Sequence, residues 1–117
     1  MPGPNCDILV IDDQAGVRWL IREALIDEGY SVDQAANGYE ALAKLGENKY
    51  RLILLDVKMP GMNGLETLQA IKKVDSQVPV VMMTAYGELD MEETVQQITK
   101  PFDLNELRKL VRENLRA

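Results

Sequence analysis

The chain has 117 residues, enough for one domain with a buried core, and its net charge of −6 disfavours direct binding to nucleic acid. A single cysteine excludes an internal disulfide and a cysteine zinc site, and the absence of histidine leaves any histidine chemistry to a partner. No apolar stretch of membrane length and no signal-peptide pattern is present, so we expect a cytoplasmic protein that does not bind membranes.

The N-terminal half alternates strand and helix patterns. Residues 6–11 (CDILVI) form a continuous apolar run, typical of a strand buried on both faces. Apolar residues then recur at helical spacing: Val17, Leu20, Ile21, Ala24 and Leu25. Gly29 suits the end of that helix, and a weaker strand (30–36, YSVDQAA) and a short helix (38–47, GYEALAKLGE) follow.

The C-terminal half continues the alternation, with predicted strands at 51–56 (RLILLD) and 78–85 (VPVVMMTA) and predicted helices at 64–74, 87–97 and 104–115. In the helix at 64–74, the residues expected to face the core are Leu65, Leu68, Ile71 and Val74. Asp103 is the expected N-cap of the last helix. Between the last two helices only a short segment around Ile98 and Thr99 is available for a fifth strand.

This alternation predicts an α/β fold: a doubly wound (βα)5, flavodoxin-like three-layer sandwich with a parallel sheet. Because ligands in such folds bind beyond the carboxyl ends of the strands, the residues at those ends matter most. They are Asp12, Asp13, Asp56, Thr84 and, on the last short segment, Lys100. We therefore expect three carboxylates, a hydroxyl and an ammonium group to meet at one edge of the sheet.

Three neighbouring carboxylates repel one another, and a hard divalent cation relieves that repulsion. Mg²⁺ prefers oxygen ligands and shares phosphate oxygens, and a carboxylate beside it can act as a nucleophile that carries a phosphoryl group. Asp56, which ends an apolar strand and precedes a glycine- and proline-containing loop, is the candidate nucleophile. Lys100 would supply positive charge and Thr84 a hydroxyl to the transferring group.

The ordered motifs IDD (11–13), LLDVKMPGMNG (54–64), MTA (83–85) and KPF (100–102) resemble the receiver domain of bacterial two-component response regulators. Within that family the match is to the stand-alone sporulation phosphorelay regulators of Gram-positive spore formers. The resemblance covers 1–117 and implies a single receiver domain without an output domain. It also implies a response regulator that takes a phosphoryl group from a histidine kinase and passes it to a histidine phosphotransferase in sporulation initiation.

The roles implied by the resemblance are Asp56 as phosphoacceptor, Asp12, Asp13, Asp56 and the backbone carbonyl of Lys58 as Mg²⁺ ligands, and Thr84 and Lys100 as groups that contact the phosphoryl group. Mn²⁺ could take the place of Mg²⁺. The protein would catalyse its own aspartyl phosphorylation and slow dephosphorylation. The family also has a cis bond at Lys100–Pro101, which an X-Pro bond adopts at low cost.

The resemblance places a partner-binding surface on the first helix and the loops beside the site: Gln14, Val17, Leu20, Tyr86, Pro101 and Phe102. An apolar patch there would let a helical bundle bring a phosphohistidine to Asp56. Trp19 lies off the apolar face of the first helix, where it is either a scattered surface aromatic or part of this surface.

Taken singly, the site residues also have structural readings. Asp12 and Asp13 could be turn and N-cap residues, Asp56 a solvated strand end, and Lys100 a surface lysine. Their coincidence at the ends of several strands favours a functional site. A chemotaxis-like binding switch shares every site residue, and a receiver without chemistry remains an alternative. A phosphohydrolase acting on small molecules is disfavoured, because its second acid would stand at Lys58.

One segment departs from the family, in which a full helix, a turn and a fifth strand precede the lysine. Here residues 87–97 run almost directly into the motif at Lys100, so the fourth helix and fifth strand are expected to be shortened or incomplete. The position of the family's switch or partner-contacting residue falls on Gln97, to which we assign no role.

Overall fold

The structure, a computed structural model, describes residues 5–85 and 96–115 and contains five strands and four helices in that part of the chain. The strands are β1 (Cys6–Ile11), β2 (Val32–Ala35), β3 (Tyr50–Asp56), β4 (Val80–Ala85) and β5 (Gln96–Lys100). The helices are α1 (Ala15–Asp27), α2 (Gly38–Glu47), α3 (Gly64–Val74) and α4 (Leu104–Leu115). The strands form one parallel sheet in the order β2-β1-β3-β4-β5, which confirms the predicted doubly wound α/β fold.

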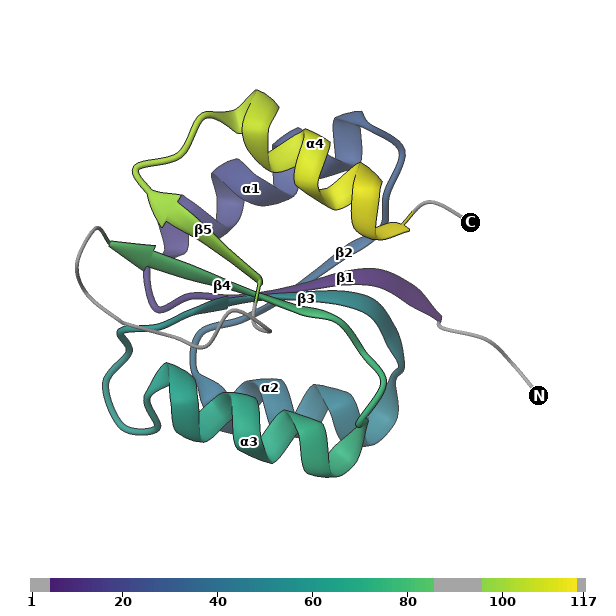
Figure 1. Cartoon of the computed structure of the whole chain (residues 1–117). Helices are drawn as coiled ribbons and strands as arrows, with labels where there is room; N and C mark the ends of the chain where they lie inside the picture. Colours follow the sequence, from purple (N-terminus) through teal and green to yellow (C-terminus); the bar gives the residue numbers. More distant parts are fainter. Residues whose placement is uncertain (1–4, 86–95, 116–117) are drawn as a thin grey trace.

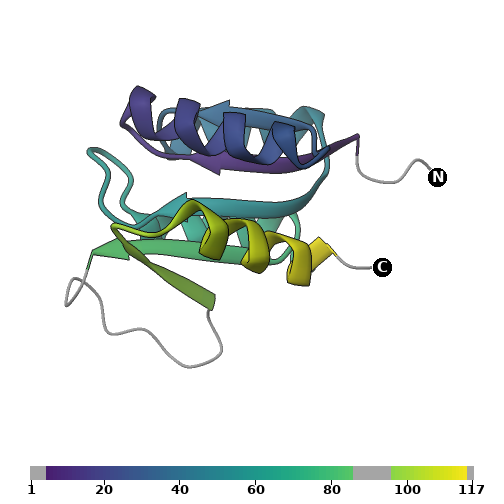
Figure 2. The same ribbon diagram turned by 90° about the horizontal axis from the view of Figure 1, so that it is seen from above.

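Helices cover both faces of the sheet, with α1 and α4 on one face and α2 and α3 on the other (Figure 1). Seen from above, α1 and α4 lie side by side (Figure 2). Residues along β1 alternate between two core clusters: Leu9 and Ile11 pack in the cluster under α2 and α3, and Ile8 and Val10 in the one under α1 and α4. All four are fully buried, because a parallel strand in the middle of the sheet has no solvent face.

Most of the predicted apolar residues of α1 and α3 are buried or pack against the core, but three are exposed. Leu20 of α1 is 47% exposed and Val74 of α3 is 54% exposed, and Leu65 is exposed as well. The inward residues of α3 are Gly64, Thr67 and Ile71. The first turn of α3 approaches the β3 backbone so closely at Gly64 that a small residue has to face inward there, which turns Leu65 outward.

The predicted ends of the first and last helices are confirmed. Gly29 follows α1 with φ 97°, and its N–H donates to Ile26 O at 2.9 Å. A positive φ costs glycine little, so this position ends the helix cleanly. The side chain of Asp103 accepts a hydrogen bond from the Asn105 N–H at 2.6 Å and thereby caps α4.

The expectation of an incomplete fifth strand is wrong. β5 has five residues, because Gln96 and Gln97 pair with Val81 and Met82 of β4 in a regular parallel ladder. Backbone hydrogen bonds form this ladder, so exposed polar side chains are compatible with it on an edge strand. The end of the helix expected at 87–97 is therefore strand, and the rest of that predicted helix lies outside the described residues.

Within 5–85 and 96–115, no helix combines the length and the apolar character needed to cross a membrane. This finding concerns helices alone. A cytoplasmic location stays a prediction.

Candidate functional site

Two buried carboxylates stand at the carboxyl ends of the central strands. Asp56 is the last residue of β3 and is 5% exposed, and Asp12 follows β1 and is fully buried. Asp12 Oδ1 accepts the backbone N–H of Gln14 at 2.9 Å, and its own N–H donates to Ala35 O at 3.1 Å. The strands hold both groups rigidly at one edge of the sheet, as the sequence predicts.

A third carboxylate, the exposed Asp13, completes an acidic cluster with Asp12 and Asp56. One carboxylate oxygen from each lies within 4.8 Å of the others. The three negative charges and the single positive charge of Lys100 sum to −2, the charge that one divalent cation neutralises. Carboxylate oxygens at this spacing suit a hard cation such as Mg²⁺, so the residues present fit that ion.

Lys100 contributes a positive charge beside two of these carboxylates. It ends β5, where it pairs with Ala85 of β4, and the predicted cis bond to Pro101 is present. Its Nζ lies 2.8 Å from Asp12 Oδ2 and 3.3 Å from Asp56 Oδ1. Burial alone would lower the pKa of Lys100, but the hydrogen bond and charge of Asp12, together with Asp56, raise it, so the ammonium form is firmly held.

The pKa of Asp56 is raised above its ordinary value. Burial is the largest cause and the charge of Asp12 adds to it, while Lys100 and the backbone N–H of Lys58 partly offset both. A carboxylate with a raised pKa holds its charge in an unfavourable environment. Additional positive charge at this site would therefore stabilise the ionised form of Asp56.

The acidic cluster opens onto a cleft of about 580 Å³. The described residues that line it are Asp13, Gln14, Asp56, Lys58, Met59, Pro60, Ala85 and Lys100. Thr84 is buried at the end of β4 and is not among these lining residues. The structure thus brings the acidic residues and Lys100 together, and it places Thr84 beside the site without showing it on the cleft wall.

The geometry shows that these residues are more than structural, although Asp12 also makes a local turn bond to the Gln14 N–H. The N-cap of α1 is Gln14, whose side chain makes no capping hydrogen bond, so neither Asp12 nor Asp13 occupies the N-cap position. Asp56 is buried rather than solvated. The Lys100 side chain is only 24% exposed and pairs with two carboxylates, which a surface lysine has no reason to do.

The predicted partner-binding residues differ in accessibility. Gln14 lines the cleft and is exposed, as are Leu20 and Pro101. Val17 and Phe102 are partly buried against the core cluster under α1 and α4. Tyr86 lies outside the described residues. The use of these residues in partner binding stays a prediction.

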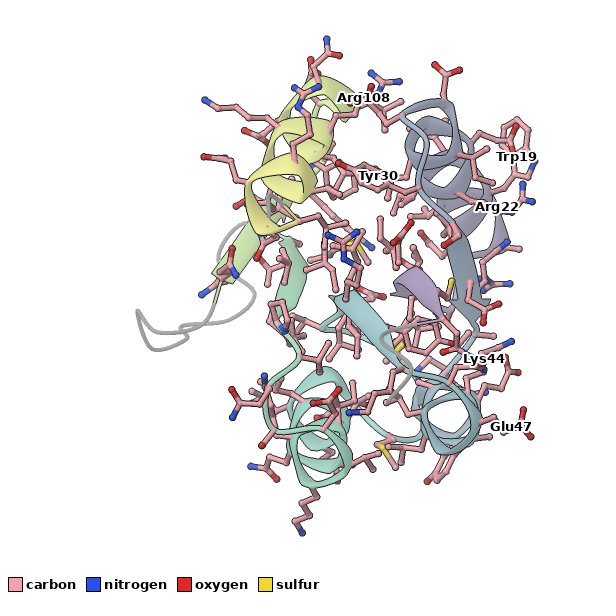
Figure 3. All side chains as sticks on the ribbon, turned by 90° about the vertical axis from the view of Figure 1, so that its right-hand side faces the viewer. Trp19, Arg22, Tyr30, Lys44, Glu47 and Arg108 are labelled. Atoms are coloured by element: carbon pink, nitrogen blue, oxygen red, sulfur yellow. The ribbon has the colours of Figure 1, made fainter. Side chains whose placement is uncertain are left out.

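Trp19 is an exposed aromatic on α1. It points away from the sheet, whereas Tyr30 lies between α1 and α4 (Figure 3). Trp19 has 59% of its surface exposed, as expected for a residue off the apolar face of the helix. Exposure alone leaves both of its readings open.

The sequence analysis did not identify Arg18, which stabilises the position of the Asp12 backbone through a hydrogen bond. Its Nη1 donates to Asp12 O at 2.6 Å and its Nε to Gln34 Oε1 at 3.3 Å, so it ties the backbone of the acidic residue to β2. A single arginine in an amphipathic helix carries no sequence signal for such a role, because the acceptor Gln34 belongs to a different element.

Replacement of Asp13 by alanine is expected to weaken Mg²⁺ binding by about tenfold or more and to leave the free energy of unfolding nearly unchanged. Asp13 is an exposed member of the cluster, so its loss would remove a candidate ligand without opening the core. Titration calorimetry measures the affinity, with Asp27→Ala, an exposed carboxylate at the end of α1, as the charge-matched control. Equal Mg²⁺ affinities of the two variants would remove Asp13 from the metal site.

Known proteins share this fold and these motifs. The family model of the response regulator receiver domain matches residues 8–112, and the chain belongs to this family. It is 44% identical to Sporulation initiation phosphotransferase F of Bacillus subtilis over 117 residues, which cover 95% of this chain and 94% of that protein. It also matches transcriptional regulators of which it spans only 50% and 24%.

Two solved structures show the same architecture. Chemotaxis protein CheY4 of Vibrio cholerae is 31% identical, with a TM-score of 0.84 over 94% of this chain and 98% of that one. Response regulator protein TrrA of Thermotoga maritima, solved in complex with Mg(2+)-BeF, is 36% identical, with a TM-score of 0.84 over 94% and 99% of the two chains. The chain is thus the receiver domain of a two-component response regulator, a class that normally interacts with histidine kinases or phosphotransferases.

Proposed function

We propose that the protein accepts a phosphoryl group from a histidine kinase on Asp56, in a Mg²⁺-dependent reaction, and passes it to a histidine phosphotransferase. The observation that carries the proposal is the environment of Asp56. This carboxylate is held rigidly at the end of β3, opens onto the cleft, and lies beside two further carboxylates and the Lys100 ammonium group. Residues 1–117 would act as one receiver domain, which the family match to 8–112 supports.

The metal would be held by the carboxylates of Asp12, Asp13 and Asp56 and by the backbone carbonyl of Lys58. Support comes from the oxygen spacing of the cluster, from its net charge of −2 and from the Mg(2+)-BeF complex of TrrA. When bound, the ion supplies positive charge that offsets the repulsion among carboxylates and the phosphoryl oxygens.

The chain's own residues would perform the transfer as follows. An Asp56 carboxylate oxygen attacks phosphorus, and the bond from phosphorus to the donor's histidine nitrogen breaks as the acyl phosphate forms. Lys100, already within hydrogen-bonding distance of Asp56, would stabilise the negative charge on the phosphoryl oxygens. Thr84 would donate its hydroxyl to the same group. The resulting acyl phosphate would then be hydrolysed slowly by water.

A role in a phosphorelay that initiates sporulation is supported by the relative from Bacillus subtilis, which this chain matches over nearly its full length. The chain has no histidine, so both the donor and the next acceptor in a relay would be partner proteins. Gln14, which lines the cleft, and the exposed Leu20 and Pro101 would form the docking surface, together with the partly buried Val17 and Phe102.

A second candidate is a chemotaxis-like switch, in which phosphorylation of Asp56 changes binding to a partner and no transfer follows. The likeness to chemotaxis protein CheY4 favours it. The two functions use the same site, but only in the relay is the phosphoryl group transferred from Asp56 to a histidine. Transfer from phosphorylated protein back to a histidine phosphotransferase supports the relay, whereas stable phosphorylation with altered partner binding supports the switch.

The first test is intact-mass spectrometry of the protein incubated with Mg²⁺ and acetyl phosphate. We expect a single phosphoryl adduct on the wild type, its loss with EDTA, and no adduct on Asp56→Ala. Asp27→Ala, which removes an exposed carboxylate of α1, is the matched control and should be labelled normally. An adduct on Asp56→Ala equal to that on the wild type would reject Asp56 as the phosphoacceptor.

A further inference from the structure

The starts of α2 and α3 are in unusually close contact. These helices lie side by side on the same face of the sheet (Figure 1). A Cβ atom placed on Gly38, the first residue of α2, would lie 2.6 Å from Thr67 Oγ1 and 2.8 Å from Met62 Sδ. A methyl group fits there only if the side chains of Thr67 and Met62 shift.

On α3, the contact involves the side chain of Thr67, which has little room to move. Thr67 is fully buried, and its Oγ1 donates to Asn63 O at 2.8 Å. Asn63 is the N-cap of α3 and forms a reciprocal capping box with Glu66. A displacement of Thr67 would therefore also move Asn63, the last residue of the loop between β3 and α3.

The loop of residues 57–63 follows Asp56 directly, and a backbone hydrogen bond joins its first residue to the start of α3. The Gly64 N–H donates to Val57 O at 2.8 Å, and a Cβ on Gly64 would lie 2.5 Å from Val57 Cα. Within the loop, the Lys58 backbone N–H faces the Asp56 carboxylate and favours its ionised form. The position of the loop thus sets how this N–H and the Lys58 carbonyl lie relative to Asp56.

On α2, the residues that precede Gly38 connect the contact to Asp12, another member of the acidic cluster. The Asn37 side chain accepts the Glu40 N–H at 2.9 Å and caps α2 directly before Gly38. Two residues earlier, Ala35 O accepts the Asp12 N–H at 3.1 Å. The start of α2 therefore links the end of β2, beside Asp12, to the loop beside Asp56.

We propose that Gly38 and Thr67 are positioning residues of the phosphoacceptor site, whose direct contact fixes the 57–63 loop and with it the Lys58 backbone relative to Asp56. This inference rests on the proposed function, since it assigns the Lys58 carbonyl to the bound metal. Neither residue lines the cleft or touches the reacting atoms. Each acts through the loop.

The test compares Gly38→Ala with Gly46→Ala. Both place the same methyl group in α2, but a Cβ on Gly46 has nothing within 4 Å. For Gly38→Ala we expect a shifted Lys58 amide signal in the NMR spectrum of the metal-free protein. We also expect Mg²⁺ affinity by calorimetry, and the phosphorylation rate constant, to fall by about tenfold. Gly46→Ala should match the wild type in all three, and Gly38→Ala behaving like Gly46→Ala would overturn the proposal.

If urea unfolding shows that Gly38→Ala is not folded, a second pair of variants tests the proposal in its place. Thr67→Ser keeps the hydroxyl that bonds Asn63 O, whereas Thr67→Val removes it at nearly constant volume. The proposal expects the Lys58 amide shift and the Mg²⁺ affinity to stay near wild type in Thr67→Ser and to change in Thr67→Val. Equal values for both variants would overturn it.

These readouts separate the inference from the proposed function. A wild type that takes no phosphoryl group from acetyl phosphate rejects the proposed function. The Lys58 amide signal, recorded without metal or phosphodonor, still supports or overturns the positioning role of Gly38 and Thr67 in that case.

Discussion

Replacement of Asp56 by asparagine is expected to abolish phosphoryl uptake and, at the same time, to raise the free energy of unfolding of the metal-free protein at neutral pH. Burial and the neighbouring Asp12 charge raise the pKa of Asp56, so its ionised form destabilises the folded state. Asparagine keeps the shape and removes the charge, and it still leaves Lys100 paired with Asp12. We expect a gain of about 1–2 kcal/mol, since one pKa unit corresponds to about 1.4 kcal/mol of preference between the two protonation states.

The pH dependence of this gain has a definite sign. A carboxyl group whose folded pKa is raised binds its proton more tightly in the folded than in the unfolded state. Its contribution to stability is therefore present below the unfolded pKa of about 3.9 and is lost as the pH rises through the folded pKa. The difference between Asp56→Asn and the wild type, measured by urea unfolding with EDTA, should be small at low pH and grow toward neutral pH.

Asp7 is a control of opposite sign. Burial alone would raise its pKa, but hydrogen bonds from Ser31 and the pairing with Arg51 outweigh burial and lower it. Its contribution is present above the unfolded pKa and lost as the pH falls through the folded pKa. Asp7→Asn should therefore lose about 1 kcal/mol at neutral pH. A loss of stability in Asp56→Asn like that in Asp7→Asn would contradict the account of the site.

Replacement of Lys100 by methionine is expected to destabilise the metal-free protein by about 2–3 kcal/mol. Methionine keeps much of the apolar stem but leaves Asp12, Asp13 and Asp56 without the cation that pairs with two of them. Removal of one partner from a buried ion pair typically costs about 3–5 kcal/mol, and the partial exposure of Lys100 lowers that figure.

Saturating Mg²⁺ should restore part of the stability lost in Lys100→Met, since a divalent cation supplies positive charge to the same carboxylates. Urea unfolding with and without Mg²⁺ measures both effects. Lys49→Met, an exposed lysine that follows α2, is the charge-matched control and should shift the midpoint little. Similar midpoints for the two methionine variants in EDTA would show that Lys100 does not offset the acidic cluster.

Most of the site could be predicted because strand ends are visible in the sequence. Asp12 and Asp56 each follow or end a strand pattern, and Lys100 stands in a motif on a short last segment; parallel strands bring their carboxyl ends to one edge. This conclusion holds even though these residues are far apart along the chain. The predicted cis bond before Pro101 is likewise a local property of a motif.

The buried faces of α1 and α3 were harder to predict. Leu20, Leu65 and Val74 fit a helical apolar pattern, yet the structure exposes all three. Periodicity identifies a helix and its apolar residues, but the rotation of the helix about its axis depends on its neighbour. At α3 the close approach of Gly64 to Val57 selects the inward face.

The amino-acid sequence by itself determined the order of strands and helices from β1 to β4 and the last helix, the helix ends at Gly29 and Asp103, and the acidic residues at the strand ends, because each depends on a local pattern. Only the tertiary structure decided that Arg18 holds the Asp12 backbone and that Gln96 and Gln97 extend β5. The same holds for the contact between α2 and α3 at Gly38. These features arise between elements distant along the chain, and their geometry is set by how closely the packed backbones approach one another.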